Sequence, residues 1–198
     1  MNNLNHYLII NGATDMEGHS QNILEQTKRL QELVSASTIK KVFEIGFNAG
    51  HSADTFLKSN TNINLVSCDL NERPCVKYGK EYIDKTYPNR HSLILGDSIV
   101  KVPEYIKQYP ENKYDLIFID GGHSYEIAKA DLINCKELAH KDTIVLVDDV
   151  SNYITQQCSW AIEPTNVWNE FIKNNFIKEI AHDDYAIGRG MSWGKYIF

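Results

Sequence analysis

The segment Lys41-Val42-Phe43-Glu44-Ile45-Gly46-Phe47-Asn48-Ala49-Gly50-His51-Ser52 decides how this chain folds. Its pattern predicts a buried strand, a tight glycine turn and the start of a helix. A dinucleotide fingerprint needs glycines at the first, third and sixth places, but counted from Gly46 those places hold Gly46, Asn48 and His51. The turn therefore suits a nucleoside ligand that has no pyrophosphate.

An acidic residue ends the next apolar run. Asp69 lies 23 residues beyond Gly46, at the predicted end of the second strand. In open α/β sheets ligands bind outside the carboxyl ends of the strands, and an acid at this distance can accept both ribose hydroxyls. The glycine turn and Asp69 together predict a nucleoside site.

Strand-length apolar runs alternate with segments of helical period along the whole chain, which predicts βαβ units and a mostly parallel sheet. We expect one domain over residues 1–198, in which residues 1–38 form a helical extension or lid. Pro74 and Pro103 suit first-turn positions of helices. The expected strands are 41–46, 63–69, 91–95, 114–120 and 143–148, followed by a hairpin of 176–180 and 191–198 around Gly188-Arg189-Gly190.

Composition excludes several classes of protein. The net charge of -6 and the pI of about 5.6 argue against a protein that wraps a nucleic-acid backbone. The apolar run Tyr7-Leu8-Ile9-Ile10 is too short for a signal peptide or a membrane span. The four cysteines form no Cys-x-x-Cys pair, which favours reduced thiols. We expect a cytoplasmic protein without membrane or extended nucleic-acid partners.

The glycine turn with Asp69 resembles the class I S-adenosylmethionine-dependent methyltransferases. The resemblance implies an α/β, Rossmann-like fold with a mostly parallel seven-stranded sheet of order 3-2-1-4-5-7-6, the last strand antiparallel, and helices on both faces. It also makes Asp97, in Leu95-Gly96-Asp97-Ser98, the acceptor for the adenine amino group. The implied cofactor residues are Glu44, Gly46, Phe47, Asn48, Gly50, Ser52, Asp69, Leu70, Asp97, Ser98 and Asp120.

The charge of the expected crevice agrees with this cofactor. S-adenosylmethionine carries a sulfonium and an ammonium, which acidic residues stabilise, whereas a NAD pyrophosphate would prefer helix N-termini and cations. An NAD-dependent enzyme is therefore the less favoured interpretation.

A second acidic group follows the fourth and fifth expected strands, in Asp120-Gly121-Gly122-His123-Ser124-Tyr125-Glu126 and Asp148-Asp149. If these strands are neighbours, their terminal carboxylates can converge on one hard cation, with magnesium the default and manganese or calcium possible. This arrangement resembles the metal-dependent O-methyltransferases of the methyltransferase 24 type, related to sugar and catechol O-methyltransferases. We therefore assign Asp120, Asp148 and Asp149 to the metal.

Methyl transfer to oxygen requires that the acceptor hydroxyl lose its proton. A bound cation lowers the pKa of that hydroxyl, and His123 can accept the proton at neutral pH. The sequence thus predicts an O-methyltransferase of a small sugar or phenol, with His123 and Asp120 as catalytic residues. Alternatives are a metal-independent N-methyltransferase and a non-catalytic S-adenosylmethionine-binding protein, because Asp120 and Asp148 could instead cap helices and His123 could be a turn residue.

Residues that would contact the acceptor are less clearly signalled. Tyr153, Trp160 and Trp168 could stack on a ring, although Trp168 fits a core position better. Tyr7 and His19 are candidates to close over the cofactor. A homodimer through the last helix and hairpin stays open.

Overall fold

A single mixed sheet forms the centre of the computed structural model, which describes residues 3–13 and 19–198. Its strands are β1 (Lys41–Ile45), β2 (Asn64–Asp69), β3 (His91–Leu95), β4 (Tyr114–Ile119), β5 (Ala139–Asp148), β6 (Ile177–Ala186) and β7 (Arg189–Tyr196). Their order is β3-β2-β1-β4-β5-β7-β6. The first five strands pair in parallel, and β7 runs antiparallel to both β5 and β6. The predicted fold class and strand order are confirmed.

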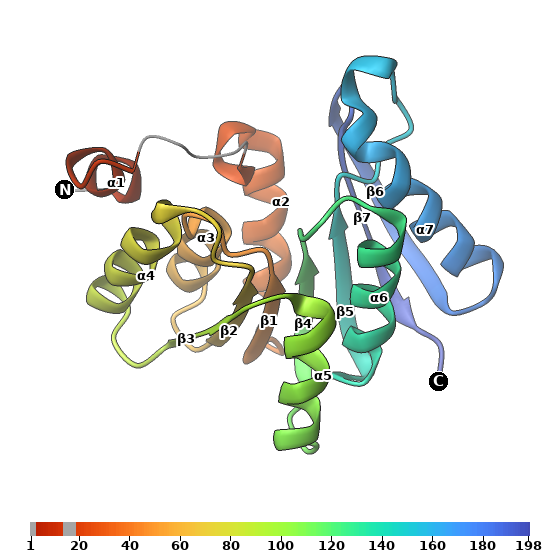
Figure 1. The fold of residues 1–198 in the computed structure, drawn as a ribbon. Helices are drawn as coiled ribbons and strands as arrows, with labels where there is room; N and C mark the ends of the chain where they lie inside the picture. Colours follow the sequence, from red (N-terminus) through yellow and green to blue (C-terminus); the bar gives the residue numbers. More distant parts are fainter. Residues whose placement is uncertain (1–2, 14–18) are drawn as a thin grey trace.

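Helices cover both faces of the sheet (Figure 1). They are α1 (Leu4–Ile10), η1 (Ser20–Asn22), α2 (Leu24–Val34), α3 (His51–Ser59), α4 (Pro74–Thr86), α5 (Ser98–Gln108), α6 (Tyr125–Lys136), η2 (Gln156–Ala161) and α7 (Ile162–Lys173). One core joins the sheet to α2, α3 and α4, and a second joins it to α5, α6 and α7. The result is a three-layer α/β/α domain, in which alternate strand residues face opposite cores.

The two cores follow from the strand sequences. Phe43, Ile117 and Val145 belong to the core under α5, α6 and α7, whereas Val42 and Leu116 belong to the opposite core. All five side chains are fully buried. Because both faces of these strands are covered, their sequences are apolar without a polar alternation. This burial holds the carboxyl ends of β1, β4 and β5 in register.

Several boundaries differ from the predicted ones. β5 begins at Ala139 rather than at 143, because Ala139 pairs with Tyr114 before a register shift. Pro103 lies inside α5 rather than in its first turn, since the Asp97 carboxylate caps the helix by accepting from the Ile99 N–H at 3.0 Å. β6 extends to Ala186, so the hairpin turns at residues 187–188 and Arg189 is already in β7.

The amino-terminal part packs beside α4. Leu4, Leu8 and Ala13 form a small core with Ala49 and Cys75. The described part of residues 1–38 is helical in α1, η1 and α2, and residues 1–2 and 14–18 of the predicted extension lie outside the described residues. Its role as a lid stays a prediction.

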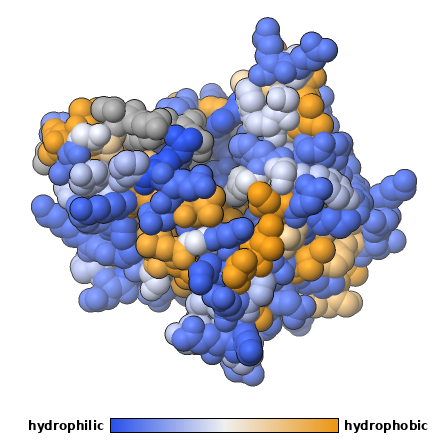
Figure 2. All heavy atoms as spheres, viewed as in Figure 1, coloured by the Kyte–Doolittle hydropathy of each residue, from blue (hydrophilic) through white to orange (hydrophobic). Residues whose placement is uncertain are grey.

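The surface is mostly hydrophilic on the face shown in Figure 2, with hydrophobic side chains gathered near its middle. Within residues 3–13 and 19–198, no helix combines the length and the apolar character that crossing a membrane requires. The four cysteines are buried free thiols, as the sequence predicted.

Candidate functional site

A cavity of about 610 Å³ opens at the carboxyl ends of β1, β2, β3, β4 and β5. This volume is within the range of small-molecule sites in proteins. The predicted site residues that line it are Gly46, Asn48, Asp69, Leu70, Asp97, Ser98, Asp120, His123, Asp148 and Asp149. The structure therefore brings both predicted groups to one cavity. We call them the nucleoside side, which comprises Gly46, Asn48, Asp69, Leu70, Asp97 and Ser98, and the acidic side, which comprises Asp120, His123, Asp148 and Asp149.

Gly46 allows β1 and β4 to approach at the floor of this cavity. Its φ is +92°, and a Cβ at this position would lie 1.8 Å from the carbonyl oxygen of Asp120. Gly50 has φ +85° and forms the N-cap of α3. Both glycines of the turn therefore meet a backbone requirement that other residues satisfy poorly.

Glu44 lies beneath the cavity and does not line it. Its carboxylate accepts hydrogen bonds from the Ser52 hydroxyl and, at 2.5 Å, from the Ser67 hydroxyl. Burial raises the pKa of Glu44 to about 7. Glu44 and Ser52 thus tie β1, β2 and α3 together, which supports the cavity wall from behind.

Phe47 and Gly50 also do not line the cavity. Phe47 is buried and its ring stacks on His91, with centroids 5.0 Å apart. Gly50 faces the Phe47 ring. The assignment of Glu44, Phe47, Gly50 and Ser52 as cofactor contacts stays a prediction, and the structure gives each of them a packing role.

Asp69 joins the two loops on the nucleoside side. Its Oδ2 accepts from the Asn48 N–H at 2.7 Å and its Oδ1 from the Asn71 N–H at 2.7 Å. Asn48 and Asn71 both have positive φ, which Asn tolerates better than most residues. A carboxylate oxygen accepts more than one hydrogen bond, so Asp69 can hold the loops and still accept from ribose hydroxyls.

A buried acid that the sequence did not single out lies behind this wall. Asp131, on α6, is fully buried, and its Oδ2 would lie 2.9 Å from a Cβ placed on Gly121. Burial raises the pKa of Asp131 to about 7, and neither of its carboxylate oxygens has a hydrogen-bond partner among the described residues. Asp131 thus places a carboxyl group of α6 against the loop that carries Gly121.

We expect Asp131→Asn to be more stable than the wild type at pH 8 and to differ little from it near pH 4. The native state binds a proton on Asp131 that the unfolded state releases between about pH 4 and pH 7, so wild-type stability falls as the pH rises through that window. The expected gain at pH 8 is on the order of 3 kcal/mol. Urea unfolding at both pH values measures it, with the exposed Glu126→Gln on the same helix as control. An equal pH response of Asp131→Asn and the wild type would contradict this role.

The acidic side of the cavity brings together Asp120, His123 and Asp149. One potential ligand atom from each lies within 4.8 Å of the other two. His123 Nε2 is 3.1 Å from Asp149 Oδ2. Asp149 is buried, and its Oδ1 has no hydrogen-bond partner among the described residues. Such an orphaned oxygen is costly unless a cation or a donor meets it, and oxygen and imidazole ligands suit a divalent metal.

Asp148 is placed differently from its neighbour. Its Oδ1 accepts from Gln26 Nε2 of α2 at 2.7 Å, and it is not part of the group that could share one ion. Burial and the charge of Asp149 raise its pKa to about 7. Burial and the charges of Asp148 and Asp149 likewise raise the pKa of Asp120 well above its ordinary value. Asp148 as a third ligand therefore stays a prediction, with one oxygen already engaged.

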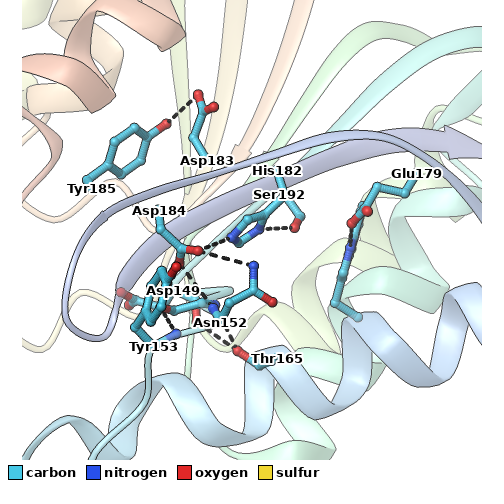
Figure 3. A network of polar contacts seen from close by, with 12 residues as sticks. Asp149, Asn152, Tyr153, Thr165, Glu179, His182, Asp183, Asp184, Tyr185 and Ser192 are labelled. Atoms are coloured by element: carbon cyan, nitrogen blue, oxygen red, sulfur yellow. Dashed lines mark hydrogen bonds and ion pairs between the residues drawn. The ribbon is translucent and has the colours of Figure 1, made fainter.

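A polar network fixes the loop that follows Asp149 (Figure 3). Asp184 of β6 accepts from the Ser151 hydroxyl at 2.8 Å and from the Asn152 N–H at 3.1 Å. His182 Nε2 lies 2.9 Å from Asp184 Oδ2. Although burial opposes it, these hydrogen bonds hold the pKa of Asp184 below its usual range. The network anchors the loop to the β6–β7 hairpin, which helps hold Asp149 at its φ of 56°.

Among the aromatic candidates, only Trp160 lines the cavity. Trp168 is a core residue whose indole N–H donates to Glu179 at 2.6 Å, as its helical spacing suggested. Tyr153 is exposed. Neither Tyr7, which contacts Tyr82 and Glu81, nor His19, which stacks on His51, belongs to the lining.

Two further residues of the site carry no local signal in the sequence. Arg189 lines the cavity from the first position of β7, and Gln26 reaches Asp148 from α2. Gln26 is 122 residues from Asp148 in the chain, so only the tertiary fold brings them together. The sequence around Gln26 therefore does not indicate that its side chain contacts the site.

The comparisons agree with this geometry. Residues 43–150, more than half of the chain, match a family described as a methyltransferase domain. A search of the curated proteins finds no match.

Similar solved structures include the O-methyltransferase from Bacillus cereus in complex with SAH, with 18% identity, a TM-score of 0.75, and 98% of this chain and 90% of that chain covered. Another is the O-methyltransferase TomG from Streptomyces achromogenes in complex with SAM, with 13% identity, a TM-score of 0.73, and coverage of 98% and 87%. A third is CalS11, a TDP-rhamnose 3′-O-methyltransferase in calicheamicin biosynthesis, with 19% identity, a TM-score of 0.66, and coverage of 95% and 85%. At these identities the likeness shows a common fold. With the family matched over the strands and loops that build the cavity, the chain belongs to the methyltransferase domain family, as an S-adenosylmethionine-dependent methyltransferase of the class I fold.

Proposed function

We propose that the protein is an O-methyltransferase that moves the methyl group of S-adenosylmethionine to a hydroxyl of a small sugar or phenol, assisted by a divalent cation. The observation that carries this proposal is the convergence of Asp120, His123 and Asp149 beside the nucleoside side of one cavity. The solved structures named above support it as analogies: two are described as O-methyltransferases in complex with SAH or SAM, and the third as a TDP-rhamnose 3′-O-methyltransferase.

The nucleoside side would bind the cofactor through its acids. Asp69 would accept from the ribose hydroxyls, and Asp97 from the adenine amino group, although Asp97 Oδ1 also caps α5. Gly46 and Asn48 line the cavity between them and the acidic side. The sulfonium and ammonium of S-adenosylmethionine fit this mostly acidic wall electrostatically.

Asp120 and Asp149 would hold the cation, most simply magnesium, because their carboxylates are hard ligands and Asp149 Oδ1 is buried without a partner among the described residues. Such an ion would lower the pKa of an acceptor hydroxyl beside it. Magnesium binding by variants of His123 and Asp148 tests which of these two residues is a further ligand.

His123 would take the hydroxyl proton. Its Nε2 lies 3.1 Å from Asp149 Oδ2, so Asp149 can orient the ring and stabilise the imidazolium that forms when the other ring nitrogen accepts the proton. The O–C bond forms as the C–S bond breaks, and the electron pair of the broken bond stays on sulfur. Alignment of oxygen, carbon and sulfur within one cavity supplies the rest of the acceleration.

We expect His123→Ala to lower kcat for methyl transfer about 100-fold or more, the usual contribution of a positioned base. The affinity for S-adenosylhomocysteine should stay within about twofold, because His123 lies on the acidic side. His140→Ala is the matched control, since His140 also pairs with an aspartate, Asp115, at 3.1 Å but outside the cavity lining. Transfer of labelled methyl groups and calorimetry measure the two quantities. An unchanged kcat would remove His123 as the base, whereas a lost magnesium affinity would make it a ligand.

The alternatives are separated by removal of the metal. An O-methyltransferase of the proposed type loses activity with EDTA and regains it with magnesium. Activity on an amine that EDTA does not change would favour an N-methyltransferase without metal. Binding of S-adenosylmethionine without methylation of sugar, phenol or amine acceptors would favour a non-catalytic protein of this fold.

A further inference from the structure

Arg189 places a guanidinium in the wall of the cavity. It is the first residue of β7, it is half-buried, and it lies directly after Gly188 of the hairpin turn. The Arg189 side chain forms no hydrogen bond and no ion pair with residues 3–13 or 19–198. A partly desolvated guanidinium carries five donors that need acceptors. A guanidinium in this position can therefore bind an anionic group of a ligand.

Arg189 lies on the acidic side of the cavity rather than on the nucleoside side. In the antiparallel pairing of β7 with β5, Met191, two residues beyond Arg189, lies opposite Asp148, and Arg189, Asp148 and Asp149 all line the cavity. The adjacent Gly188 carbonyl accepts from the indole N–H of Trp160 at 3.2 Å. The guanidinium therefore lies near the groups proposed to act on the acceptor.

Trp160 packs against Gly188, the residue that precedes Arg189. A Cβ on Gly188 would lie 2.2 Å from Cys158 Cβ and 3.5 Å from the Trp160 ring, so the turn and η2 pack closely. The indole lines the cavity and is 38% exposed. A partly exposed ring fixed at its N–H offers a flat surface on which a sugar or aromatic ring can stack.

We propose that Arg189 and Trp160 form an acceptor subsite for a ring that carries an acidic group, a carboxylate or a phosphate, in addition to the methylated hydroxyl. Arg189 binds the acidic group, for which its planar fork allows two parallel hydrogen bonds, and Trp160 stacks on the ring. This inference rests on the proposed function for the chemistry, but binding to the subsite does not require that the methyl group be transferred.

Matched ring pairs test the inference by calorimetry on the protein loaded with S-adenosylhomocysteine and magnesium. The pairs are 3,4-dihydroxybenzoate with catechol, glucuronate with glucose, and glucose 1-phosphate with glucose. The acidic member of at least one pair is expected to bind about 10-fold tighter or more, and the pair that responds distinguishes carboxylate from phosphate. In Arg189→Gln this preference should fall toward one, whereas Arg189→Lys should keep part of it. Trp160→Ala should weaken both members of the responding pair.

Arg29→Gln is the control, because Arg29 pairs with Asp183 and Glu32 and does not line the cavity. The thermal midpoint of Arg189→Gln reports that it folds. Equal binding of acidic and neutral members in the wild type would overturn the inference, and so would an Arg189→Gln variant that keeps the preference. A matched loss of S-adenosylhomocysteine affinity in Arg189→Gln would assign the guanidinium to the cofactor carboxylate instead, and would also overturn it. Arg189-dependent binding without methyl transfer would leave the subsite standing and contradict the proposed function alone.

Discussion

Asp149→Ala is expected to abolish magnesium binding and to lower methyl transfer about 100- to 1000-fold, while the affinity for S-adenosylhomocysteine changes little. The buried Asp149 Oδ1 has no partner among the described residues, and Asp149 Oδ2 faces His123 at 3.1 Å. Removal of this carboxylate would take away a proposed metal ligand and the group proposed to orient His123, and either loss would be costly on its own. Calorimetry with magnesium and with S-adenosylhomocysteine, and a methyl-transfer assay, measure the three effects.

Two further aspartates make this experiment specific. Asp142→Ala removes an exposed carboxylate at the opposite end of β5 and should behave as the wild type. Asp148→Asn tests the predicted third ligand: its carboxylate already accepts from Gln26 at 2.7 Å, so a small loss of magnesium affinity would restrict the ligands to Asp120, Asp149 and His123. Magnesium binding by Asp149→Ala that equals wild-type binding would refute the metal site as proposed.

The strands of the sheet could be predicted because each one is marked by residues that are close together in the sequence. Each central strand is an apolar run that ends beside a glycine or an acid, as in β1 before Gly46 and β4 before Asp120. Those same ends form the cavity, so a correct strand assignment also brought Asp69, Asp120 and Asp149 to one edge of the sheet. The predicted order followed from the family resemblance and is confirmed.

The roles of individual side chains were less predictable, because they depend on what packs around them. Glu44 fits a cofactor motif in sequence, yet two serine hydroxyls from α3 and β2 enclose its carboxylate. Asp97 both caps α5 and lines the cavity, so the two interpretations of an acid after a strand are compatible. Arg189 was assigned to a turn, because the length of β6 depends on its pairing with β7 rather than on its own sequence.

Gly46→Ala is expected to lower the free energy of unfolding by about 3 kcal/mol or more and to weaken S-adenosylhomocysteine binding. Two separate costs combine at this position. The φ of +92° is unfavourable for alanine, and the new Cβ would lie 1.8 Å from the Asp120 carbonyl oxygen, which belongs to backbone that cannot rotate away. To relieve the contact, the ends of β1 and β4 must separate, which displaces the loop before Asn48 and the loop that carries Asp120.

Gly12→Ala separates these two costs. Gly12 also has a positive φ, +79°, but a Cβ there would meet no atom of residues 3–13 or 19–198 within 4 Å, so the expected effect of its substitution is the conformational cost of about 1 kcal/mol. The difference between the two variants in urea unfolding therefore measures the price of separating β1 from β4. Equal losses of stability in the two variants would mean that the ends of β1 and β4 can separate at little cost in free energy. The cavity would then not depend on their close approach. A much larger loss of stability in Gly46→Ala, with weaker S-adenosylhomocysteine binding, would show that the close contact between Gly46 and Asp120 both stabilises the sheet and positions the glycine turn beside Asp120.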